Sequence, residues 1–173
     1  MILLIPHQMN TIKRFFKFTV AGGFFILFSC ISKDSVSELE KEKTLEDIKA
    51  SINGAIGWAK NKDFNLLNSI IANDSNYLEV DPGPGLIKGF SQFKRNDSIW
   101  GSPDFKAVRY EIRDLTINIA EKGNVVWFYC ILDDINEWKG QSASWMNTRW
   151  TGVLEKRGKR WIMVQMHFSF AKE

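Results

Sequence analysis

The chain has 173 residues, of which 45% are hydrophobic, so it is long enough for one globular domain with a sizeable core. Its formal charge of +3 comes from residues 1–29, which contain three of the 23 lysines and arginines and none of the 20 aspartates and glutamates. The rest of the chain is balanced in charge and lacks the basic excess that usually accompanies binding to phosphates, so we expect no nucleic-acid partner.

Residues 1–29 have the pattern of a secretory signal peptide. The basic residues Lys13, Arg14 and Lys17 come first, and an apolar run at 18–28 follows them. This run is shorter than the ~20 residues that span a bilayer as a helix. We therefore interpret the segment as a leader that is removed from the mature protein.

The leader ends in "LFSC" (27–30), which resembles the lipobox of bacterial lipoproteins and implies an acylated Cys30 at the mature N-terminus. An ordinary secreted protein with an incidental cysteine is the alternative. Acyl chains anchor by about 0.8 kcal/mol per buried methylene, so several chains would hold the protein at a membrane. We expect a membrane-anchored lipoprotein of the cell envelope, periplasmic or surface-exposed, with a polar tether at 30–43 and one domain at 44–173.

A helical hairpin is predicted at the start of this domain. The first helix begins with Thr44 as its N-cap, has apolar residues at helical spacing and ends near Asn61. The second is capped by Asp63 and has an apolar face from Phe64 to Ile71.

The next segment alternates between turns and short elements. A short strand is predicted at 77–81, and the "PGPG" loop at 82–85 excludes both helix and central strand. A third short helix is predicted from Gly89 to about Ile99.

From residue 106 onward, polar and apolar residues alternate with a period of two, which predicts antiparallel strands. The strands are expected at 106–119, 125–133, 142–156 and 160–170. The apolar phase of the first strand shifts near Arg113 and Asp114, which predicts a bulge and a bend. Between the second and third strands, a loop at 134–140 would place Trp138 at the mouth of a pocket. The fold class is therefore α+β, with three helices packed on a curved antiparallel sheet around a cone-shaped space.

Three segments carry a resemblance to a known family: "GWAKNKDFNLLNSII" (57–71), "GNVVWFYCIL" (123–132) and "RWTGVLEKRGKRWIMVQMHFS" (149–169). Together they resemble the nuclear transport factor 2-like superfamily and, within it, the SnoaL-like group. The resemblance implies the cone-shaped fold over nearly the whole mature domain. Since this superfamily includes isomerases, dehydratases, polyketide cyclases and non-catalytic binding domains, the fold does not decide the function.

Polar residues on one face of the strands are the candidate site. On the final strand, Gln165 and His167 alternate with a uniformly apolar face. If the mixed faces line the cone, His167 and Asp133 are candidate acid–base catalysts. The candidate ligand-binding residues are then Trp127, Tyr129, Trp145, Asn147, Arg149 and Gln165.

Each of these roles has an alternative. His167 can be a structural histidine bonded to a backbone carbonyl, and Arg149 can pair with Asp133 or Glu155 instead of a ligand carboxylate. Cys130 lies inside an apolar strand and is expected to be a buried free thiol. We expect no cofactor and no metal, because one histidine without clustered carboxylates or cysteines does not match the spacing of a zinc site.

Two functions are compatible with this pattern. The first is a lipid-anchored domain that binds a small, partly apolar organic molecule, with or without isomerase, cyclase or hydro-lyase chemistry. The alternative is a non-catalytic module that dimerises or docks a partner. In either case we expect a homodimer through the sheet, since its second face is too apolar to lie in water.

Overall fold

The structure is a computed structural model, and it describes residues 33–171. The leader and Cys30 lie outside the described residues. The helices are α1 (Lys33–Gly57), α2 (Phe64–Ile70), α3 (Phe90–Phe93) and α4 (Asp97–Trp100), with two short 3-10 helices, η1 (Trp58–Asn61) and η2 (Lys94–Asn96). The strands are β1 (Leu78–Val80), β2 (Leu86–Lys88), β3 (Phe105–Ile119), β4 (Val125–Trp138), β5 (Gln141–Ser142), β6 (Trp145–Arg157) and β7 (Arg160–Ser169).

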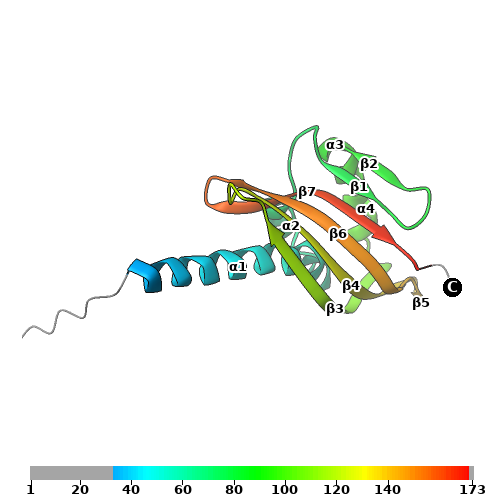
Figure 1. Cartoon of the computed structure of the whole chain (residues 1–173). Helices are drawn as coiled ribbons and strands as arrows, with labels where there is room; N and C mark the ends of the chain where they lie inside the picture. Colours follow the sequence, from blue (N-terminus) through cyan, green and yellow to red (C-terminus); the bar gives the residue numbers. More distant parts are fainter. Residues whose placement is uncertain (1–32, 172–173) are drawn as a thin grey trace, which may run out of the picture. The chain divides into compact units, whose positions relative to one another are not determined.

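The strands form one sheet in the order β2-β1-β7-β6-β4-β3, and β5 pairs with β4. All neighbouring strands are antiparallel except β1 and β7, which are parallel. Figure 1 shows the long strands curving across the domain, with α1 and α2 on one side of them. This arrangement confirms the predicted α+β class with a curved, unclosed sheet.

Bulges produce the curvature. The register between β3 and β4 shifts between Arg113 and Thr116, where Asp114 has a φ of 54°, so the predicted bulge is confirmed. A second shift occurs between Leu132 and Asp134 in the pairing of β4 with β6. The extra residue of this second bulge is on β6, where Asn147 has a φ of 50°.

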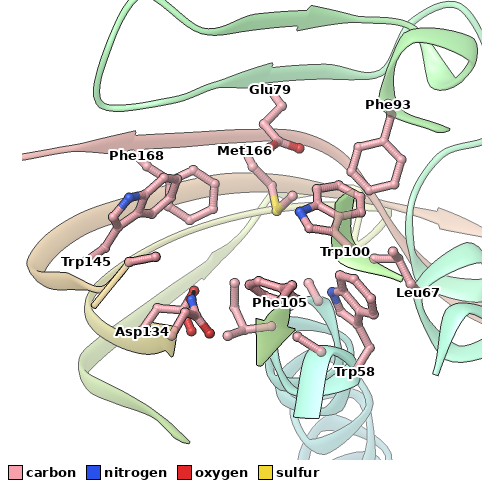
Figure 2. Close-up of a pocket in the computed structure, with 15 residues that line it drawn as sticks. Trp58, Leu67, Glu79, Phe93, Trp100, Phe105, Asp134, Trp145, Met166 and Phe168 are labelled. Atoms are coloured by element: carbon pink, nitrogen blue, oxygen red, sulfur yellow. Dashed lines mark hydrogen bonds between the residues drawn. The ribbon is translucent and has the colours of Figure 1, made fainter. Parts of the chain in front are cut away.

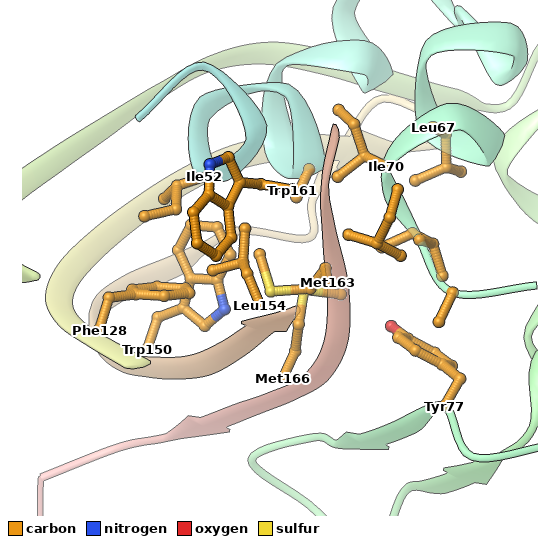
Figure 3. Packing of buried hydrophobic residues seen from close by; sticks show 14 of the residues in the cluster. Ile52, Leu67, Ile70, Tyr77, Phe128, Trp150, Leu154, Trp161, Met163 and Met166 are labelled. Carbon is orange, nitrogen blue, oxygen red and sulfur yellow. The ribbon is translucent and has the colours of Figure 1, made fainter. Parts of the chain in front are cut away.

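The core lies between the helices and one face of the sheet, which we call the inner face. Phe128, Trp150 and Phe168 belong to this face and are at most 3% exposed. The rings of Phe128 and Trp150 meet edge to face at 4.9 Å, and those of Trp150 and Phe168 stack at 5.5 Å. From the helix side, Ile48 and Ile52 of α1 are fully buried, and Figure 3 shows Ile52 beside the aromatic and methionine side chains of the sheet.

The first helix begins earlier than the sequence predicts. It starts at Lys33, so the prediction of Thr44 as its N-cap is wrong. Lysine and glutamate are good helix formers, and residues 37–43 of the added turns are exposed and include the pair Lys41–Glu38 at 2.8 Å. The predicted tether is therefore helical over the part of it that the structure describes.

The other local predictions hold in part. Asp63 caps α2, accepting a hydrogen bond from the backbone of Leu66 at 2.9 Å, as predicted. The loop expected at 134–140 is wrong, because β4 continues to Trp138 and only then turns into β5. No helix within the described residues is long and apolar enough to cross a membrane.

Candidate functional site

A pocket of about 220 Å³ lies between the helices and the inner face of the sheet. Figure 2 shows it from close by. It is lined by Ala55, Ile56, Trp58, Ala59, Leu67, Glu79, Phe93, Trp100, Phe105, Asp134, Asn136, Ala143, Trp145, Met166 and Phe168. The lining is mostly apolar with a few polar groups, which is the usual composition of a small-molecule site.

Aromatic rings form the walls of this pocket. On the helix side, Trp58 packs edge to face on Trp100 with ring centroids 5.4 Å apart, and Phe93 lies 5.2 Å from Trp100. On the sheet side, Trp145 and Phe168 are 5.3 Å apart. The aromatic rings therefore line the pocket both on the helices and on the strands.

Glu79 is the first polar group of the pocket. It lies on β1 opposite Met166 of β7, is 7% exposed, and accepts a hydrogen bond from the hydroxyl of Tyr77. The pKa of Glu79 is raised to about 7, chiefly by burial; the bond from Tyr77 opposes the shift and the nearby Asp81 adds to it. Glu79 is thus a carboxyl group that titrates near neutral pH in an aromatic environment.

Asp134 and Asn136 supply the remaining polar groups from the end of β4. Asp134 lies on the same face of β4 as the buried Phe128 and Leu132, pairs with Trp145 of β6 and lines the pocket. Asn136 donates a hydrogen bond from Nδ2 to Oδ2 of Asp134 at 2.8 Å. Burial raises the pKa of Asp134, and the bond from Asn136 partly offsets this. The other amide atom, Asn136 Oδ1, is buried without a hydrogen-bond partner.

Of the residues predicted to bind a ligand, the structure places Trp145 in the pocket. Trp127 and Tyr129 lie on the opposite, outer face of the sheet and are 48% and 39% exposed. Arg149 and His167 are also exposed on this outer face. The predicted location of these four residues in the pocket is therefore wrong. The helices cover the uniformly apolar face because burying that face removes more apolar surface from water.

Gln165 also belongs to the outer face. It pairs with Val153 of β6, which in turn pairs with Trp127 of β4. The neighbour of His167 on β6 is Thr151, not Arg149. The predicted grouping around His167 is therefore not formed in the pocket.

Asp133 and Asn147 do come together, but outside the pocket lining. Asp133 accepts a bond from the backbone of Asn147 at 2.7 Å and forms an ion pair with Arg113 at 3.0 Å. Arg113 also donates to Oδ1 of Asn147 at 2.9 Å. Asp133 thus pairs with Arg113, whereas the sequence suggested Arg149 as its partner. The contacts among Arg113, Asp133 and Asn147 connect the bulge of β3 with the bulge between β4 and β6.

Sequence reasoning missed Glu79, Asp134 and Asn136. The signal for Glu79 was a carboxylate in the middle of the short apolar strand "YLEVD" (77–81). For the other two residues the signal was the alternation of β4 itself, since Asp134 and Asn136 continue the face of Phe128, Cys130 and Leu132 beyond the predicted end of that strand at residue 133.

The remaining sequence predictions concern thiol and metal chemistry. Cys130 is fully buried and burial raises its pKa to about 12, which confirms a core thiol. Within residues 33–171, no three histidine, cysteine, aspartate or glutamate side chains gather as potential metal ligands.

Comparison with solved structures supports the fold. A nuclear transport factor 2-like protein with a cystatin-like fold from Novosphingobium aromaticivorans is 12% identical and has a TM-score of 0.62, with coverage of 83% of this chain and 92% of that one. The hexachlorocyclohexane dehydrochlorinase LinA-type3 from Novosphingobium barchaimii is 14% identical with a TM-score of 0.60, covering 79% and 99%. A nuclear transport factor 2-like protein from Cytophaga hutchinsonii is 13% identical with a TM-score of 0.58, covering 76% and 98%.

At these identities the likeness establishes the fold alone. A sequence search of curated proteins found no match. The family model described as the SnoaL-like domain matches residues 48–173, which is most of the chain and includes every element that lines the pocket. The chain therefore belongs to the SnoaL-like domain family, with the nuclear transport factor 2-like fold.

Proposed function

We propose that this domain binds a small, partly apolar organic molecule in the pocket on the inner face, and that Glu79 exchanges a proton with it. The observation that carries the proposal is a buried carboxyl group with a pKa of about 7 in an aromatic cavity. Strongly shifted carboxyl groups in clefts concentrate at functional sites.

The pKa of Glu79 suits it to acid–base catalysis. A general base works best when its pKa lies near the operating pH, since it is then both largely ionised and basic enough to remove a proton. The hydroxyl of Tyr77 binds Oε2 of Glu79 and fixes the orientation of the carboxyl group. Asp134 provides a second carboxyl group in the same pocket, so a proton can be removed at one position and returned at another.

The reaction class that fits two such groups is isomerase-, cyclase- or hydro-lyase-like. One of the similar structures is named for a dehydrochlorination, which is an elimination and requires removal of a proton. This likeness supports acid–base chemistry as the class to test first.

A ligand screen tests the proposal. The purified protein is screened by thermal shift against cationic, neutral and anionic aromatic compounds, and the affinity of each hit is then measured for two variants. Ala143→Phe places a ring at an exposed position of the pocket lining and is expected to abolish binding, whereas Glu79→Gln is expected to abolish turnover of any substrate found. His167→Ala on the outer face is the matched control and should leave both ligand binding and turnover unchanged. A hit that survives Ala143→Phe but is lost in His167→Ala would refute this assignment.

The cell-envelope location is a further part of the proposal. The lipobox-like "LFSC" and the exposed charged turns of α1 support an acyl anchor at Cys30. In cells, Cys30→Ser is expected to move the protein from the membrane fraction to the soluble fraction and to abolish labelling by palmitate. An unchanged membrane fraction would contradict the anchor.

Dimerisation through the outer face is a second candidate function. The exposed aromatic side chains of Trp127 and Tyr129 support it, together with Met146, which is 49% exposed. Sedimentation at micromolar concentration should give about twice the monomer mass, and Tyr129→Lys should halve it. A monomer at that concentration would contradict a dimer.

A further inference from the structure

We infer that the ligand of this pocket is an organic cation, a molecule with a protonated amine and an aromatic or aliphatic body. The inference rests on the proposed function, because it specifies which class of molecule the same pocket takes. It is carried by the charges and the aromatic walls of the pocket.

The charges of the lining are of one sign. Glu79 and Asp134 both line the pocket, and among the residues that the structure describes no lysine, arginine or histidine does so. A ligand with a carboxylate would bring a further negative group next to Asp134 and to Glu79, which is partly ionised at neutral pH, in a poorly solvated space where like charges repel strongly. A cation is instead attracted by Asp134 and favours the ionised form of Glu79.

Asn136 orients Asp134 in the pocket lining. It is only 8% exposed, and its Nδ2 donates a hydrogen bond to Oδ2 of Asp134 at 2.8 Å. The carboxyl group of Asp134 therefore has a fixed position in the lining.

Asp134 is therefore a fixed acceptor for one ammonium group. Trp145 lies opposite Asp134 on the neighbouring strand, and the face of an indole is the strongest aromatic partner for a cation. Figure 2 shows Trp145 and Asp134 at one end of the pocket and Trp58 and Trp100 at the other. The ammonium group would lie at the first end and the apolar body of the ligand at the second.

The volume limits the size of the ligand. An engineered cavity of ~150 Å³ holds benzene, so the 220 Å³ of this pocket corresponds to roughly nine non-hydrogen atoms. Aromatic amines with a single ring are of this size.

Three probes that differ mainly in charge test the inference by calorimetric titration of the purified protein at neutral pH. These are benzylammonium, benzyl alcohol and benzoate. Benzylammonium is expected to bind about tenfold more tightly than benzyl alcohol, since a hydrogen bond from the ammonium group to the carboxylate of Asp134 contributes about that much, and benzoate is expected not to bind. In Asp134→Asn the preference for benzylammonium over benzyl alcohol should fall to near unity.

Glu137→Gln is the control, because it removes one negative charge from the same strand outside the pocket lining and should leave the preference unchanged. Equal or tighter binding of benzyl alcohol or benzoate would overturn the cation inference and leave the pocket as a ligand site. If Glu137→Gln also loses the preference for benzylammonium, the cation inference is overturned, because the preference then comes from the overall charge of the protein. If none of the three probes binds, the cation inference falls, and the broader screen with Ala143→Phe decides separately whether the pocket binds ligands.

Discussion

The two faces of the central sheet are built from the same strands and both carry aromatic residues, yet their surroundings differ completely. On the inner face Phe128 and Trp150 are at most 2% exposed, whereas on the outer face the adjacent Trp127 and Tyr129 are 48% and 39% exposed. Aromatic content alone therefore does not identify the pocket. The pocket is identified by the face that the helices cover. Its polar groups lie at the margins of that face, on β1 and at the end of β4.

The largest difference between the faces is expected in stability. Trp150→Ala should lower the free energy of unfolding by about 3–5 kcal/mol, because it removes a fully buried ring that packs on both Phe128 and Phe168. Trp127→Ala on the outer face should cost less than about 1 kcal/mol at a protein concentration too low for the dimer proposed above. Chemical denaturation of both variants measures the contrast, and similar losses would mean that the outer face is also buried in solution.

The pH dependence of stability tests the environment of Glu79. A carboxyl group whose pKa rises from 4.5 to about 7 on folding retains its proton longer in the folded state. Its favourable contribution is therefore complete below pH 4.5 and is lost as the pH rises to about 7, by roughly 3 kcal/mol.

Glu79→Gln removes this titration. The variant should become more stable relative to wild type as the pH rises from 4.5 to 7, and the difference should level off above that. Denaturation curves of the two proteins across this range measure it, and groups other than Glu79 largely cancel in the difference. A difference that stays flat would show that Glu79 titrates as an exposed carboxylate.

A smaller loss is expected where two strands approach closely. A Cβ added at Gly152 of β6 would lie 2.5 Å from Cε1 of Phe128 and 3.0 Å from the backbone oxygen of Gln165. Gly152→Ala should therefore cost about 1–3 kcal/mol through overpacking. Thr151→Ala, at the neighbouring position on the outer face, is the control for thermal unfolding. An equal change in both variants would contradict the tight inner packing.

The smallest effect is expected for His167, despite its prominence in the sequence. It is exposed on the outer face, so His167→Ala should change the free energy of unfolding by less than about 0.5 kcal/mol. Thermal denaturation measures this. A loss above 1 kcal/mol would indicate that another copy or partner buries this side chain.

The sequence predicts much of the fold because the signals are local. The alternation from residue 106 onward predicts all four long strands, and Asp63 predicts the start of α2 through its side-chain cap. The early start of α1 at Lys33 was not predicted, because a run of lysine and glutamate is compatible with both an exposed helix and an unstructured tether.

The residues of the candidate site were not predicted for a different reason. A period of two defines two faces of a strand but does not say which one the helices cover. The polar groups of the pocket are far apart in the chain, with Glu79 on the short β1 and Asp134 in the part of β4 that lies beyond the predicted end of that strand at residue 133. Their meeting depends on the parallel pairing of β1 with β7, and the sequence carries no local signal for that pairing.

The location of the ligand site is the central claim, and the tryptophan side chains report on it directly. The indole N–H signals of a ¹⁵N-labelled sample are recorded during titration with benzylammonium or with any hit from the screen, and are assigned by single Trp→Phe variants. We expect the signals of Trp58, Trp100 and Trp145 to shift, because these rings line the pocket, and the signal of Trp127 to stay unchanged. A shift of Trp127 alone, with the three pocket signals unmoved, would place the ligand on the outer face and contradict the account.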